Sequence, residues 1–221
     1  MFFPQLVAGP IVRASDLIPQ LYRDYPLLWE NCLKGLQLVL WGYFMKCGVA
    51  DSLSHVVDHH FAAPSQFSSW SLTFAVFMYA FQIYGDFAGY SLTAIGIGEM
   101  LGFDLGRNFD RPYFSASFSE FWKRWHISLS TWLRDYLYIS LGGNRHGEFK
   151  TYRNLMVTML LGGLWHGASW NFIIWGGLHG LFLVVQRMTT PFYSKLIAPF
   201  IPSWILRPVL ICFIFLLTCL T

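Results

Sequence analysis

The longest stretch without a charged side chain runs from Asn154 to Gln186, and it constrains this chain more than any other feature. It holds no Asp, Glu, Lys or Arg, but it does hold two histidines, His166 and His179. An apolar run of this length predicts burial in a membrane. Because ionisable side chains are costly at membrane depth, a histidine there is by default a candidate functional residue.

The composition of the whole chain agrees with a membrane environment. Of its 221 residues, 55% are hydrophobic and 19% aromatic, and only 12% are charged, whereas soluble domains carry about 25% charged residues. The formal net charge of +3 is modest, and nucleic-acid binding would need a concentrated basic face. We therefore expect an integral membrane protein whose partner is the lipid bilayer, with no nucleic-acid partner.

The apolar run is too long for one simple span. Its glycine pairs and the motif WHGASW at residues 165–170 predict two segments that meet near His166 to Ser169. Three glycines, Gly176, Gly177 and Gly180, would let the second segment pack tightly.

His166 stands among glycines that allow a sharp turn or the close approach of another backbone or a ligand. A neutral imidazole in an apolar, glycine-lined recess suits a general base, because its unperturbed pKa lies near working pH. The alternative is a packing histidine that is hydrogen-bonded between helices.

The remaining apolar stretches predict further spans. Asn31 to Ala50 is the first, Trp70 to Met100 the second, and Ile205 to Leu220 the last. Asp86 is a lone acid in the second span, so we expect it to pair with another group. Residues 1–30, with prolines at 4, 10, 19 and 26, are predicted to form a loop or re-entrant segment followed by an interfacial helix.

The stretch from Asp51 to Ser69 contains no Lys or Arg, as is typical of loops on the non-cytoplasmic side. His55 and His59 are four residues apart, a spacing that can bind a metal on a helix face. No wider ligand pattern supports such a site, so we predict a solvated polar loop and no metal site.

The segment from Leu101 to Arg153 is the most charged and is expected to face the cytoplasm. If residues 121–137 form one helix, His126 and Ser130 lie on the same face, and the tryptophans can lie at headgroup level. His126 is then a second histidine directed inward. The alternative is an interfacial histidine that is bonded to a backbone carbonyl.

Two motifs, FWKRWHISLSTWLRDYLYISLGGNR at 121–145 and GGLWHGASWNFIIWGGLHG at 162–180, resemble the membrane-bound O-acyltransferase (MBOAT) family. The similarity is greatest to its alginate O-acetyltransferase branch, then to the D-alanyl transferases of teichoic acid modification. FPQLVAGPIVR at 3–13 and FQIYGDFAGYSLTAIGIG at 81–98 also match that branch. The resemblance implies an all-α polytopic membrane protein with broken or re-entrant helices and interfacial helices. Residues 1–221 would be a single partial domain that lacks N-terminal and C-terminal helices of the family.

The resemblance also implies roles for individual residues. His166, in LWHG, corresponds to the catalytic histidine of the family, and His126, in RWHISLS, to a second functional polar residue of the reaction tunnel. Neither role follows from spacing alone.

On this basis the expected reaction moves an acetyl or other acyl group from a cytoplasmic thioester, such as acetyl-CoA, to a hydroxyl, with no bound cofactor. The acceptor would be an exopolysaccharide such as alginate, reached with a periplasmic or extracellular partner protein. Asn171 and Trp165 are candidate pocket elements. Arg124 and Arg134 would meet an anionic donor, or alternatively anchor the topology.

Other functions remain open from the sequence. The chain could transfer D-alanyl groups to teichoic acid. It could also be a transporter or channel subunit that uses His166, His179 and Asp86 as a proton or substrate pathway, although no internal repeat is visible. A non-catalytic scaffold and a di-histidine metalloenzyme are further alternatives. The family resemblance further implies a multi-pass protein of the bacterial inner membrane.

Overall fold

The computed structural model describes residues 9–23 and 28–221, and all of its regular elements in this part of the chain are helices. They form two compact units, residues 1–109 and residues 110–221. Most of the expected N-terminal motif, together with Pro4 and Pro26, lies outside the described residues.

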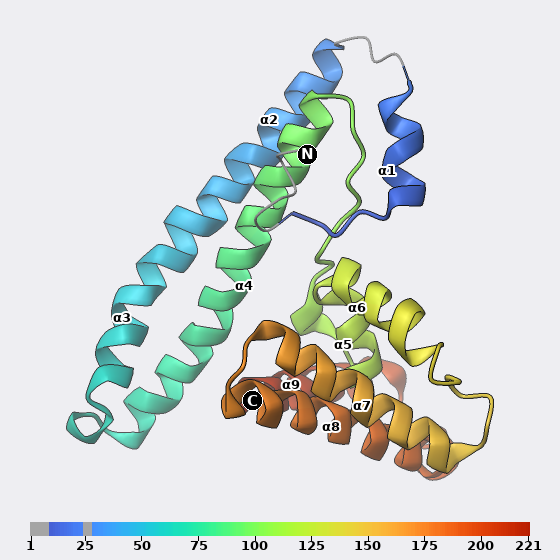
Figure 1. Cartoon of the computed structure of the whole chain (residues 1–221). Helices are drawn as coiled ribbons and strands as arrows, with labels where there is room; N and C mark the ends of the chain where they lie inside the picture. The colour runs from blue at the N-terminus through green and yellow to red at the C-terminus, as the bar shows by residue number, and fades with distance from the viewer. Residues whose placement is uncertain (1–8, 24–27) are drawn as a thin grey trace. The chain divides into compact units, whose positions relative to one another are not determined.

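Two long antiparallel rods dominate the first unit (Figure 1). One rod is a continuous run of three helical segments and the other is a single helix. Their bounds are α2 (Trp29–Tyr43), the π-helix η2 (Phe44–Ala50), α3 (Asp51–Ala62) and α4 (Ser69–Met100). A short helix, α1 (Ala14–Leu21), precedes them, and the 3₁₀ turn η3 (Pro64–Gln66) joins α3 to α4.

The polar loop predicted from Asp51 to Ser69 is wrong over most of its length, because α3 continues the first rod for 12 residues. Val57 on α3 is 1% exposed and α3 packs along α4, so one apolar face holds the polar segment helical. His55 and His59 lie on exposed faces of this helix.

Glycines bring the two rods into backbone contact. A Cβ on Gly42 would lie 2.6 Å from the Gly89 carbonyl oxygen, and Gly35 and Gly96 approach one another even more closely. Such contacts allow two helices to pack with little side chain between them.

The expected pairing of Asp86 is confirmed. Lys46 Nζ lies 2.7 Å from a carboxylate oxygen of Asp86 on α4 and 2.7 Å from one of Asp51. One ammonium therefore joins both rods, and it balances part of the negative charge that two carboxylates bring to an apolar unit.

The second unit begins with three short helical segments and ends with three longer helices. The former are η4 (Pro112–Phe114), α5 (Phe118–Arg124) and α6 (Ile127–Leu133), which runs on as the π-helix η5 (Arg134–Tyr138). The latter are α7 (Glu148–His166), α8 (Trp170–Leu196) and α9 (Ser203–Cys219).

The two-segment division of the long apolar run is confirmed, since α7 and α8 form an antiparallel hairpin (Figure 1). Gly167 to Ser169 separate them, and the Ser169 hydroxyl accepts a hydrogen bond from the Asn171 N–H at 3.4 Å, which caps α8. Cβ atoms on Gly163 and Gly176 would collide with the Phe172 and Met159 carbonyl oxygens.

The close packing predicted for the glycines of α8 holds at Gly176 and at Gly180, where a Cβ would lie 2.9 Å from the Met156 sulfur. Gly177 differs, because the nearest atom to its Cβ position is a Leu160 methyl at an ordinary 3.6 Å.

In the described part of the chain, one helix, α8, has the length and apolar composition needed to cross a membrane. The apolar helix α9 is shorter, at 17 residues.

The hairpin contact can be tested with a matched pair of glycine substitutions. Gly176→Ala should lower the free energy of unfolding by about 1–3 kcal/mol, because the new methyl must displace backbone atoms of α7. Gly177→Ala should be neutral, or stabilising by up to about 1 kcal/mol through helix propensity. Thermal unfolding of the full-length protein in detergent measures both, and equal effects would contradict the contact.

Candidate active site

His166 is the last residue of α7, so its position is set by the end of the hairpin. Gly167 follows in extended conformation, and a Cβ there would lie 2.8 Å from the Phe172 ring. The imidazole itself is exposed and stacks near Phe172 at 6.0 Å between ring centroids. Trp165 and Trp175 present their rings edge-on at 5.1 and 5.2 Å.

The single helix considered for residues 121–137 is wrong, because the chain breaks at Trp125 and His126. Trp125 is extended, and His126 is left-handed with φ 42° and ψ 56°. The break frees two carbonyls, which then find other donors. The Arg124 carbonyl accepts from the Asp110 N–H at 3.0 Å, and the Trp125 carbonyl from the Ser130 hydroxyl at 3.1 Å.

His126 is buried at 4% exposure, even though it lies in this break. Burial lowers the pKa of His126 to about 4, and the neighbouring His166 adds to the effect. Trp165 lies between the two histidines, with its ring centroid 6.0 Å from that of His126. The two histidines assigned by resemblance are therefore neighbours across one indole, although 40 positions apart in sequence.

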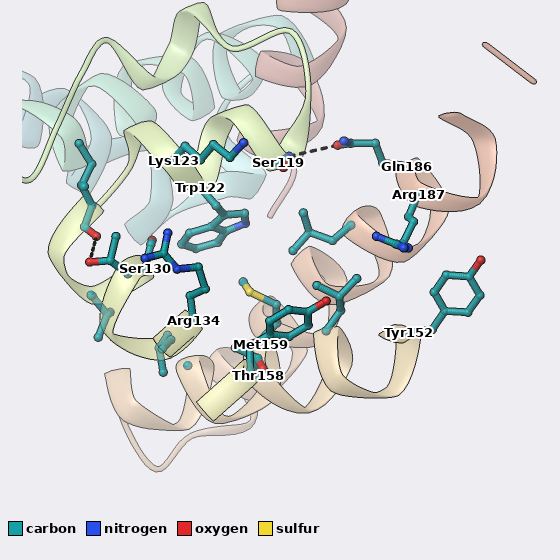
Figure 2. A pocket seen from close by; sticks show the side chains of 18 of the residues that line it. Ser119, Trp122, Lys123, Ser130, Arg134, Tyr152, Thr158, Met159, Gln186 and Arg187 are labelled. Carbon is teal, nitrogen blue, oxygen red and sulfur yellow. Dashed lines mark hydrogen bonds between the residues drawn. The ribbon is translucent and has the colours of Figure 1, made fainter. Parts of the chain in front are cut away.

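A groove of ≈ 990 Å³ runs along this part of the second unit and includes His166 in its lining. Figure 2 shows side chains of α5, α6 and η5 on its walls, including Trp122, Lys123 and Arg134, opposite residues of α7 and α8. The Ser119 N–H donates to Gln186 Oε1 at 3.1 Å and so ties α5 to α8 at the groove (Figure 2).

His179 supports the aromatic wall of this groove. It is 1% exposed, and the indoles of Trp122 and Trp175 lie 5.1 and 5.0 Å from its ring. Its Nε2 lies 3.1 Å from the Thr221 hydroxyl, whereas no hydrogen-bond partner for Nδ1 exists among the described residues. The chain Trp122–His179–Trp175–His166 is thus a continuous series of ring contacts.

An ion pair between α7 and α8 contributes to the lining of the groove. Arg187 on α8 donates two hydrogen bonds to Glu148, the first residue of α7, at 2.7 and 2.9 Å. This bidentate pair holds together the end of the hairpin that lies farthest along α7 from His166.

Of the other four predicted site residues, one lines the groove that contains His166. Arg134 lines the groove, and its guanidinium also pairs with Asp135 at 2.6 Å. Trp165 contacts both histidines without lining the groove. Asn171 is exposed in the first turn of α8, and Arg124 lies in a different cavity, paired with Glu120.

Several groove residues were not singled out from the sequence, notably Lys123, Tyr152 and the Glu148–Arg187 pair. Charged residues at helix ends are also typical of topology anchors, and only the hairpin reveals that Glu148 and Arg187 meet.

The model of the MBOAT, membrane-bound O-acyltransferase family, matches residues 1–221. The chain belongs to this family. The family resemblance inferred from the motifs is confirmed, and membership implies a membrane protein.

Three relatives with different names illustrate the similarity. The chain is 53% identical over 190 residues to a protein named probable alginate O-acetylase AlgI from Azotobacter vinelandii, covering 84% of this chain and 37% of that protein. It is 46% identical to the peptidoglycan O-acetyltransferase of Helicobacter pylori, with 84% of this chain and 36% of that protein covered. It is 33% identical to the teichoic acid D-alanyltransferase of Streptococcus thermophilus, with 84% of this chain and 48% of that protein covered. The chain thus spans between a third and a half of these relatives' length.

The burial of His126 predicts a pH effect on stability. The pKa of His126 in the folded state lies below the ordinary 6.5, so on acidification His126 takes up a proton in the unfolded chain at a higher pH than in the folded protein. The free energy of unfolding therefore decreases as pH falls from about 6.5 to 4. The contribution is at most roughly 3 kcal/mol. His126→Gln should flatten this part of the stability–pH curve, while His55→Gln on exposed α3 should leave it unchanged. Identical curves for both variants would contradict the burial argument.

Proposed function

We propose that the full-length protein is an O-acyltransferase that moves an acetyl group from a thioester donor to hydroxyl groups of an exopolysaccharide, with His166 as the general base. The observation that carries this proposal is the position of His166, at the end of a rigid hairpin and on the lining of a groove of ≈ 990 Å³. A base must present a lone pair to its substrate. The His166 imidazole is exposed and is therefore accessible to a substrate.

In the proposed reaction, His166 takes the proton of the acceptor hydroxyl as its oxygen attacks the thioester carbonyl. A C–O bond forms and the C–S bond breaks, and the thiolate leaves with the proton that the imidazolium returns. His126, neutral at working pH, lies near enough to orient the donor or the acceptor. The oxyanion needs donors, for which Asn171 and the backbone amides of the hairpin turn are candidates.

The donor is proposed to be acetyl-CoA or another acyl thioester that carries phosphate. Lys123 and Arg134 place two positive charges on the groove that contains His166 (Figure 2). Phosphate groups bind such side chains through charge-assisted hydrogen bonds. Arg134 shares its guanidinium with Asp135, so Lys123 is the stronger candidate of the two.

The acceptor is proposed to be alginate or a related polymer, because relatives near half identity are named alginate O-acetylases. An acceptor outside the inner membrane requires a multi-pass protein and a periplasmic or extracellular partner that completes the transfer. Residues 1–221 are proposed to be part of one catalytic domain. D-alanyl transfer to teichoic acid is the second candidate, favoured by more distant relatives with that name.

Replacing the proposed base provides the main test. In cells that make the full-length protein, His166→Ala should lower the polymer's ester content at least about 100-fold, because general-base catalysis contributes about 10²–10⁴. His55→Ala, the same substitution on an exposed face of α3, should keep full ester content. Equal membrane abundance is checked by immunoblot. Normal esterification in the His166 variant would refute the assignment.

A second test addresses the donor. Lys123→Gln should raise the KM for the thioester about tenfold and change kcat little, since a lost phosphate contact weakens binding in the ground state and the transition state equally. Lys195→Gln, an exposed lysine outside the groove, is the matched control. A fall in kcat with an unchanged KM would place Lys123 in the chemistry rather than in donor binding.

A further inference from the structure

A second cavity, of ≈ 330 Å³, lies apart from His166 in the second unit. Three arginines and two apolar residues line it: Arg111, Arg124, Arg207, Phe114 and Ile211. The cavity is therefore amphipathic, with guanidiniums and apolar side chains around one space. The proposed acyl transfer does not use it.

The three arginines around this cavity form ion pairs with two carboxylates, Asp110 and Glu120. Arg124 and Arg207 share a single carboxylate oxygen of Glu120, at 2.7 and 3.2 Å. The other Glu120 oxygen accepts the Ala116 N–H at 2.7 Å. Arg111 has Asp110 at a longer 3.4 Å and remains 76% exposed. Three guanidiniums thus lie around one cavity, and a phosphate group can accept charge-assisted hydrogen bonds from such side chains.

The backbone at Arg111 is unusual. Its φ of 48° and ψ of 57° place it in the left-handed region, which costs an ordinary L-residue about 1–2 kcal/mol and suits glycine or asparagine better. The turn is held by the Phe114 N–H, which donates to the Arg111 carbonyl at 3.1 Å. A strained arginine on the rim of a cavity is the kind of outlier that points to a binding function.

The cavity also has a defined place along α9. This helix begins at Ser203, has Trp204 (75% exposed) and Arg207 near its start, and continues with a mainly apolar run. Tryptophan and arginine at the start of an apolar helix are typical of the headgroup level of a membrane. Ile211 follows Arg207 by one turn on the same face, so the apolar side of the cavity lies on the hydrocarbon side of the arginines.

We propose that this cavity binds the phosphodiester headgroup of a membrane phospholipid. Arg111, Arg124 and Arg207 would donate hydrogen bonds to the phosphate oxygens, and Phe114 and Ile211 would contact the first acyl carbons. Arginine suits the phosphate because its planar fork of donors matches two oxygens at once. The proposal is independent of the assignment of His166.

The test uses the purified full-length protein in detergent, with lipid binding measured by native mass spectrometry. The probes are phosphatidylglycerol, diacylglycerol with the same chains, and coenzyme A as a soluble phosphate source. The main variant is Arg111→Gly, which removes one guanidinium and relieves the left-handed backbone, so it should fold at least as stably as the parent. Arg111→Gln/Arg207→Gln removes two guanidiniums, and Lys150→Gln/Lys195→Gln is the control with the same loss of charge.

The expected result is that phosphatidylglycerol binds about tenfold more weakly to Arg111→Gly. The double arginine variant should bind still more weakly, the lysine control should match the parent, and diacylglycerol should bind to none. Equal loss in the lysine control would overturn the proposal by showing diffuse attraction to basic residues. Retention of diacylglycerol as strong as that of the phospholipid would also overturn it. Loss of coenzyme A binding with unchanged phospholipid binding would overturn the lipid as ligand and assign the phosphate to a soluble donor.

Discussion

The backbone contact between α7 and α8 is the constraint on which the second unit depends. Gly163 and Gly176 leave so little space that carbonyl oxygens occupy the positions of missing side chains. Helices this close have few alternative registers, since a shift along the axis would bring larger residues into the same space. The hairpin therefore fixes the ends of both helices, and with them the position of His166.

The segment before the hairpin is fixed to it by polar contacts rather than by close packing. The fully buried side chain of Asn154 on α7 donates to the carbonyls of Leu141 and Gly143 at 3.1 and 2.9 Å. It thereby anchors the glycine-rich turn, whose residues 142 and 143 have positive φ. Together with the Ser119–Gln186 hydrogen bond, the hydrogen bonds of Asn154 hold η5 and α5 against the hairpin. The groove is therefore bounded on both sides by elements that are fixed to one another.

The sequence predicted the parts of this arrangement that depend on local pattern. The break after His166, the tight packing of Gly176 and Gly180, and the pairing of Asp86 all follow from glycine placement or from the cost of a charge in an apolar environment. The assignment of His166 and His126 came instead from family resemblance. It stays a prediction, although the two residues do lie together around Trp165.

What the sequence could not predict depends on long-range contacts. Helical periodicity favours one helix through His126, because Trp122, His126 and Ser130 keep a helical spacing. The break depends in part on a long-range contact, because the Asp110 N–H, 14 residues before Arg124 in sequence, donates a hydrogen bond to the freed Arg124 carbonyl. The polar composition of residues 51–69 likewise favoured a loop where α3 forms. The helix depends on the burial of Val57 against α4, and the local sequence does not reveal this contact.

The geometry of α5 explains why neighbouring basic residues of the second unit lie in two different places. Glu120 lies three residues after the α5 cap Ser117, whose hydroxyl accepts the Glu120 N–H, and its carboxylate accepts the Ala116 N–H. This arrangement is a variant of the capping box, shifted to the residue before the cap. The Glu120 carboxylate is thereby fixed on the side of α5 that faces α9, and it collects Arg124 and Arg207 there. Lys123, one residue earlier than Arg124, lies about 100° around the helix and lines the groove instead. A single turn of α5 thus places Lys123 on the groove that holds His166 and Arg124 on the arginine-lined cavity, so the two proposed binding places receive separate positive charges.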